Sequence, residues 1–101
     1  MIVYEVNVEV SDSILRAYST WLKEHVLEIL DLPGFEKANI FTDDKKFCIQ
    51  YWLASKEDLD NYFKNHAPLM RQKGTDLFKD GFSATRRILI PQYELARSGS
   101  N

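Results

Sequence analysis

The chain has 101 residues, of which 45% are hydrophobic and 13% aromatic, so it fits one folded domain and not a disordered segment. Thirteen basic and fifteen acidic residues give a net charge of −2, without the surplus of Lys and Arg that a nucleic-acid binder needs. No apolar run approaches the ~20 residues of a membrane span, the N-terminus has no signal-peptide pattern, and the single Cys48 suits a reducing compartment. We therefore expect a cytoplasmic protein with neither a nucleic-acid nor a membrane partner.

The first third of the chain predicts a strand followed by a helix. Residues 2–10 alternate in the two-residue period of a half-buried strand. From Ile14 to Leu30 the apolar residues recur at helical spacing, and Ser11 or Ser13 offers a hydroxyl N-cap. Pro33-Gly34 then ends the helix and turns the chain.

The middle of the chain predicts a hairpin and a second helix. Residues 35–42 and 46–54 form two strands joined by the short loop Asp43-Asp44-Lys45. Ser55, with Asp58 three residues later, is a variant of the capping box that opens a helix.

The last third predicts the end of that helix and a fourth strand. Pro68 lacks a backbone donor and should kink the helix or restart it at Ala67. Gly81 ends the turn before a strand over residues 82–90. Residues 92–101 form a C-terminal tail, of which residues 97–101 are polar.

The resulting order, β-α-β-β-α-β, is that of an α+β, ferredoxin-like domain over residues 1–91. We expect a four-stranded antiparallel sheet with two helices on one face. The first and third strands would form its centre, with the second beside the first and the fourth beside the third.

The face of the sheet without helices has an unusual composition for a surface in water. It carries Glu5, Asn7, Cys48, Gln50 and Trp52, which combine an aromatic ring and a thiol with amides and a carboxylate. A second copy stacking its sheet on this face would cover it, which predicts a homodimeric α+β barrel with a shared lumen. Two alternatives stay open for the tail: residues 92–101 cover Trp52 and Cys48 of their own chain, or Tyr93 and Leu95 cross to the partner.

Three parts of the sequence resemble a family of small bacterial proteins of unknown function. They are the opening strand Met1–Asn7, the stretch from Trp21 to Phe35, and Tyr62–Pro68 taken together with residues 82–88. More distantly, the chain is similar to the dimeric α+β-barrel superfamily, which includes antibiotic-biosynthesis and heme-degrading monooxygenases. That resemblance is carried by Asn7, Pro33-Gly34-Phe35 and Trp52, and it implies the dimeric barrel.

The heme-degrading branch can be compared residue by residue. Its pattern has an asparagine on the first strand, a tryptophan on the second helix and a histidine ligand about ten residues later. Asn7 matches the asparagine, but Tyr62 and Gln72 stand at the other two positions, and His66 has the wrong spacing. The resemblance therefore does not imply heme, and we expect no cofactor.

Three residues are candidates for catalysis: Glu5, Asn7 and His66. Glu5 and Asn7 project side by side from one strand, and in a closed lumen desolvation would raise the pKa of Glu5 toward that of a general base. His66, or His25, would carry the proton. The alternatives are that Glu5 pairs with Arg86 or Arg87 on a neighbouring strand or is solvated at the rim of the face, and that the histidines are core residues bonded to backbone carbonyls.

A second set of residues is predicted to contact a ligand, and an arginine among them would favour an anionic one. The set comprises Asn7, Gln50, Trp52, Tyr62 and Arg87. The register of the fourth strand is left open, so either Arg86 or Arg87 could face the lumen. Two histidines on separate helices lack a third ligand, so no metal site is predicted.

These observations favour a homodimer that binds a small organic molecule in a cavity between the two sheets. One alternative is a cofactor-independent monooxygenase-like or isomerase-like enzyme. The other is a protein–protein interaction module without catalysis.

Overall fold

Residues 1–99 are described by the computed structural model, so Ser100 and Asn101, the end of the predicted tail, lie outside the described range. The elements in chain order are β1 (Ile2–Val10), the 3-10 turn η1 (Asp12–Ile14), α1 (Leu15–Leu30), β2 (Phe35–Asp43), β3 (Lys46–Leu53), α2 (Lys56–Asn65), α3 (Ala67–Phe78) and β4 (Phe82–Leu89). The predicted order and the ferredoxin-like sheet are confirmed. The second helix is divided at His66, because Pro68 starts a new helix in its first turn.

The four strands form one antiparallel sheet in the order β2-β3-β1-β4. Two of the predicted neighbours are wrong, because β2 lies beside β3 and β4 lies beside β1. The cause lies in the connections. Asp43 pairs with Lys46 across a tight turn in which Asp44 has a φ of 56°, so β2 and β3 must be a hairpin. The chain then returns through α2 and α3 to the free edge of β1.

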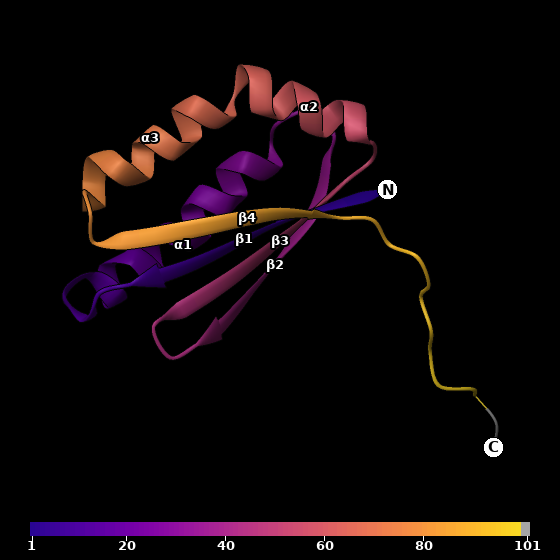
Figure 1. Cartoon of the computed structure of the whole chain (residues 1–101), viewed down its shortest axis with the longest axis horizontal. Helices are drawn as coiled ribbons and strands as arrows, with labels where there is room; N and C mark the ends of the chain where they lie inside the picture. The colour runs from indigo at the N-terminus through magenta and orange to yellow at the C-terminus, as the bar shows by residue number, and fades with distance from the viewer. Residues whose placement is uncertain (100–101) are drawn as a thin grey trace.

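The helices all lie on one face of the sheet, and the core lies between these two layers (Figure 1). The apolar side of α1 is buried there through Tyr18, Leu22, Val26 and Ile29. The facing residues of β1 and β3 alternate as the sequence predicts, with Tyr4 stacked on Tyr51 at a ring separation of 5.8 Å.

The two predicted helix caps have different outcomes. The Ser55 hydroxyl accepts a hydrogen bond from the Asp58 backbone N–H at 3.2 Å and donates one to the Asp58 carboxylate at 3.0 Å, which confirms the capping-box variant. The predicted serine cap of the first helix is wrong. The hydroxyls of Ser11 and Ser13 lie 3.1 Å from each other, and η1 precedes α1 without a side-chain cap bond.

The chain after β4 leaves the sheet and runs away from both layers (Figure 1). We call residues 91–99 the C-terminal arm. Tyr93 and Leu95 are 77% and 87% exposed, so the arm does not cover Trp52 and Cys48 of its own chain as one alternative required. The radius of gyration is accordingly 15.1 Å, against about 13 Å for a compact chain of this length.

Candidate functional site

The candidate site lies on the face of the sheet that carries no helix, which we call the open face. Strand register places four residues in a row across its centre: Asn39 of β2, Gln50 of β3, Glu5 of β1 and Arg87 of β4. The register of β4, which the sequence left open, therefore puts Arg87 on the open face and Arg86 on the helix side.

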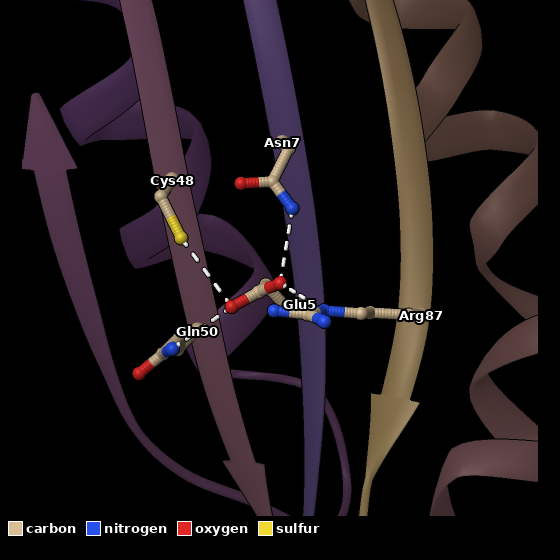
Figure 2. A network of polar contacts seen from close by, with 5 residues as sticks. All are labelled: Glu5, Asn7, Cys48, Gln50 and Arg87. Atoms are coloured by element: carbon tan, nitrogen blue, oxygen red, sulfur yellow. Dashed lines mark hydrogen bonds and ion pairs between the residues drawn. The ribbon is translucent and has the colours of Figure 1, made fainter. Parts of the chain in front are cut away.

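Glu5 is the centre of a hydrogen-bonded cluster that we call the Glu5 network (Figure 2). One carboxylate oxygen accepts from Gln50 Nε2 at 2.9 Å and from Cys48 Sγ at 3.5 Å. The other accepts from Asn7 Nδ2 at 3.0 Å and from Arg87 Nε at 2.5 Å. The Glu5 side chain is 4% exposed, although it lies on the uncovered face. The alternative in which Glu5 pairs with an arginine is thus confirmed.

The donors around Glu5 decide its charge. The hydrogen bond from Arg87, followed by those from Gln50 and Asn7, lowers the pKa of Glu5 to about 2. Desolvation acts in the opposite direction and is outweighed. The predicted rise in the pKa of Glu5 is therefore wrong, and at neutral pH this carboxylate is ionised with both oxygens occupied. A general base needs a free oxygen and a pKa near the working pH, and Glu5 has neither.

Cys48 belongs to the same network but is not an activated nucleophile. Burial, and next the nearby charge of Glu5, raise the pKa of the thiol. A thiol that stays protonated is unreactive, because the thiolate is the nucleophile. The role of Cys48 here is that of a weak donor to Glu5.

A hollow of about 420 Å³ lies beside the Glu5 network, toward the β2–β3 turn. Phe41, Asn7, Thr85 and Cys48 line it, together with the charged residues Glu9, Asp43 and Lys46. The volume falls within the ~300–1,000 Å³ range of small-molecule sites. Of the predicted ligand contacts, Asn7 lines this hollow, and Gln50 and Arg87 lie next to it in the network.

Trp52 lies farther along the open face, beside Val3 of β1 and Lys37 of β2. The Lys37 ammonium stands 4.7 Å from the centre of the indole ring, a cation–π contact. Within the described residues the indole Nε1 is buried and finds no acceptor. Trp52 is therefore on the predicted face but is not part of the hollow.

Tyr62 and His66 are not brought to this site. Tyr62 is buried in the core between α2 and the sheet, where its ring packs at 6.0 Å from that of Tyr4, and burial raises its pKa to about 12. His66 lies half-buried at the junction of α2 and α3. The sheet separates both from Glu5, because helix residues can reach only the covered face.

Comparison with known proteins places the chain in a family. A family model described as a domain of unknown function, DUF4286, matches residues 1–91. The chain belongs to the DUF4286 family. This confirms the resemblance to a family without an assigned activity, and no curated protein matches the chain.

Solved structures show how widely the fold of this DUF4286 protein is shared. A Deinococcus radiodurans protein assigned to the antibiotic biosynthesis monooxygenases is 12% identical, with 98% of this chain and 100% of that one covered and a TM-score of 0.78. SnoaB from Streptomyces nogalater, a cofactor-independent oxygenase, is 11% identical. The match covers 95% of this chain and 98% of SnoaB, with a TM-score of 0.75. MhuD with manganese protoporphyrin IX bound is 10% identical. The match covers 96% of this chain and 100% of MhuD, with a TM-score of 0.70. At these identities the likeness shows the fold alone.

The DUF4286 protein also has a second, smaller cavity, which sequence reasoning did not predict. It measures about 70 Å³ and lies between the sheet and the helices, among aromatic rings and the polar ends of His25, Arg71 and Arg86. Arg71 reaches Tyr4 Oη at 3.4 Å, and burial lowers the pKa of His25, whose ring stacks on Trp21. One feature of the sequence pointed to this cavity. One arginine of the Arg86-Arg87 pair had to face the helices, but the sequence did not show which, because the register of the fourth strand could not be assigned.

The residues do not fit a porphyrin, although one fold neighbour binds it. The inner cavity is well below the ~300 Å³ of the smallest usual ligand pockets. Gln72, at the position of the histidine ligand, is instead bonded to Asp76 at 2.7 Å on the exposed side of α3. Among residues 1–99 no group of three or more His, Cys, Asp or Glu side chains is placed to hold a metal ion. In the same range no helix is long and apolar enough to span a membrane.

Proposed function

We propose that this DUF4286 protein is a homodimer that pairs through its open faces and binds a small organic molecule between the two sheets. The observation that carries the proposal is the hollow of about 420 Å³ beside the Glu5 network. The hollow combines apolar residues such as Phe41 and Phe47 with polar groups in fixed positions, which is the usual composition of a small-molecule site.

The open face is suited to being covered by a partner. Its one buried carboxylate, Glu5, already has four donors within the chain, so a second copy can cover it without leaving an unpaired charge. Val3 is buried beside it, whereas Phe41 is 52% exposed and offers apolar area to a partner. Covering the hollow with a second sheet would close it.

The hollow is lined by the acidic Glu9 and Asp43 as well as by Lys46, so an anionic substituent would have to lie at the end near Arg87. Phe41 supplies an apolar wall, and Asn7 and Thr85 supply polar groups. Arg87 uses its Nε for Glu5, while its side chain is 64% exposed, which leaves the guanidinium edge accessible to a carboxylate or sulfonate.

The test uses 8-anilinonaphthalene-1-sulfonate, an aromatic anion that fluoresces in apolar sites, as the probe. We expect saturable binding that falls at least tenfold in Thr85→Phe, which fills the hollow, and is unchanged in Thr75→Phe, its match on exposed α3. Binding that is insensitive to Thr85→Phe contradicts the ligand site. A dimer that binds no probe favours the interaction module instead.

The inner cavity supports a second candidate, a cofactor-independent monooxygenase-like enzyme. Tyr4, Tyr62 and Arg86 line it, and they combine aromatic walls with a cation that would stabilise a substrate carbanion as it reacts with O₂. Several fold neighbours are oxygenases by name. At about 70 Å³ the cavity is also too small for a polycyclic substrate, so this candidate requires the helices to move away from the sheet. Oxygen uptake with a polycyclic phenol should be lost in Arg86→Met and kept in Arg87→Met, and no uptake by the unaltered protein contradicts this candidate.

A further inference from the structure

We infer that the C-terminal arm is exchanged between two copies of this chain, Tyr93 and Leu95 of each copy packing on the open face of the other. This inference rests on the proposed homodimer and adds the segment that completes its interface. It requires that the arm points away from its own sheet, that the dimer interface needs more buried area than the open face provides, and that the arm is long enough to contact the partner.

The arm is directed away from its own domain by its sequence. Pro91 follows directly after Ile90, lacks the N–H that would continue the sheet ladder, and keeps Ile90 extended. Beyond it, Tyr93 and Leu95 alternate with Gln92 and Glu94, the two-residue period of an extended segment with one apolar side.

The large apolar side chains of this segment are bare in the single chain, Tyr93 and Leu95 on one side and Ile90 on the other by the same two-residue period. Ile90 is 78% exposed, Tyr93 77% and Leu95 87%, and these are the three most exposed large hydrophobic side chains of the described residues. They lie within six consecutive positions on a segment that projects from the body (Figure 1). Exposed large apolar side chains concentrated on one short segment indicate an interaction site rather than scattered surface residues.

The flat outline of the open face is smaller than the area that a stable interface buries on each partner. Strands of eight or nine residues make it ~30 Å long, and four strands make it ~19 Å wide, which gives about 570 Å² per copy. A stable interface buries about 800 Å² on each partner. One buried tyrosine contributes about 150–250 Å², so Tyr93 and Leu95 together supply the missing area.

The arm is also long enough. Nine extended residues reach about 30 Å, whereas stacked sheets lie ~10 Å apart and this sheet is ~19 Å wide. The arm leaves at the end of β4, where Leu89 pairs with Val3 at the margin of the open face. From there it can cross to the partner and pack along the edge of that copy's open face that the stacked sheet leaves uncovered.

The first test is the dimer dissociation constant, measured by sedimentation equilibrium. Tyr93→Ser with Leu95→Ser should raise Kd at least tenfold, because the arm contributes to the interface and not to the core. Leu69→Ser with Leu77→Ser, which removes side chains of α3 that are 62% and 60% exposed, is the matched control and should leave Kd unchanged. An unaltered chain that dimerises with the same Kd as the arm variant overturns the arm exchange alone. A chain that stays monomeric overturns the homodimer as well.

The second test asks which copy the arm touches. A benzophenone amino acid replaces Tyr93 in ¹⁴N- and ¹⁵N-labelled protein, the two are mixed, and the cross-links are mapped by mass spectrometry. Exchange predicts that half of the cross-linked peptide pairs join one light and one heavy peptide, with the second peptide from β1, β3 or β4. Pairs that always carry a single isotope show an arm folded back on its own chain and overturn the inference.

Discussion

The charge of Glu5 is decided by its neighbours rather than by its burial. A carboxylate at 3% exposure would be expected to resist ionisation, yet four donors surround it and the strongest, Arg87, is itself charged. Glu5 therefore serves as an anchor that holds together side chains from β1, β3 and β4. Any chemistry on this face must come from the atoms that the network positions.

The lowered pKa of Glu5 predicts a dependence of stability on pH. Because its pKa is about 2 in the folded chain against 4.5 as a free side chain, the ionised network stabilises the fold fully above pH 4.5. This contribution is lost as the pH falls from about 5 to 2. After screening at the exposed Arg87 we expect about 2 kcal/mol. Urea unfolding of the unaltered protein and of Glu5→Gln should show a difference that shrinks across that interval.

Glu9→Gln is the matched control for this experiment. Glu9 lies on the same strand and is exposed, so its replacement should change the free energy of unfolding by less than ~0.5 kcal/mol at every pH. A Glu5→Gln difference that stays constant from pH 5 to 2 would show that the network does not depend on the charge of Glu5.

The sequence predicted the face of every network residue except Arg87, and it left the pairing of Glu5 with an arginine as an alternative. Alternation in β1 and β3 assigns Glu5, Asn7 and Gln50 to one side without further information. The pairing with Arg87 depends on strand order and on the register of β4, and an arginine doublet carries no signal of either. The direction of the Glu5 pKa shift was wrong for the same reason, because burial was visible in the pattern and the donors were not.

At the scale of elements, the ends of the strands could be predicted from local sequence patterns, but the order of the strands in the sheet could not. Each predicted strand ends within one residue of the observed one, since alternation and turn residues are local signals. The order of the strands is a property of the connections. The tight turn at Asp44 already required β2 and β3 to be adjacent, and that constraint conflicted with the order we predicted.

The junctions before β2 and before α2 are built against each other. Gly34 has a φ of +86°, its carbonyl accepts from Ala54 N–H at 3.0 Å, and a Cβ at this position would lie 2.3 Å from the Cβ of Asp58. Gly34 therefore serves two purposes, a left-handed backbone and a close approach to the first turn of α2.

A double-mutant cycle separates these two purposes. Gly34→Ala should cost about 3 kcal/mol in the free energy of unfolding, from backbone strain and the clash together. In an Asp58→Gly background the clash is absent, so the cost should fall to about 1 kcal/mol, the strain alone. Equal costs in the two backgrounds, measured by urea unfolding, would mean that Asp58 does not restrict the glycine.

At the scale of the whole molecule, the mixed composition of the open face was readable from the sequence, but its shape was not. The hollow depends on where Phe41, Asn7 and Thr85 end up relative to one another, and these come from three strands whose register had to be known first. The projecting arm was similarly ambiguous, because Tyr93 and Leu95 can pack on either copy with the same sequence.

The homodimer makes a prediction about the whole molecule that needs no ligand. When folding is coupled to association, the stability of the dimer depends on the protein concentration. A tenfold rise in protein concentration stabilises the folded dimer by about 1.4 kcal/mol. For two chains of this length the melting temperature should rise by about 3 °C. Phe41→Glu puts a charge on the open face and should abolish this rise, whereas Leu77→Glu on exposed α3 should keep it. A melting temperature that is independent of concentration in the unaltered protein would mean that the open face is not an interface, and the space between two sheets would not exist.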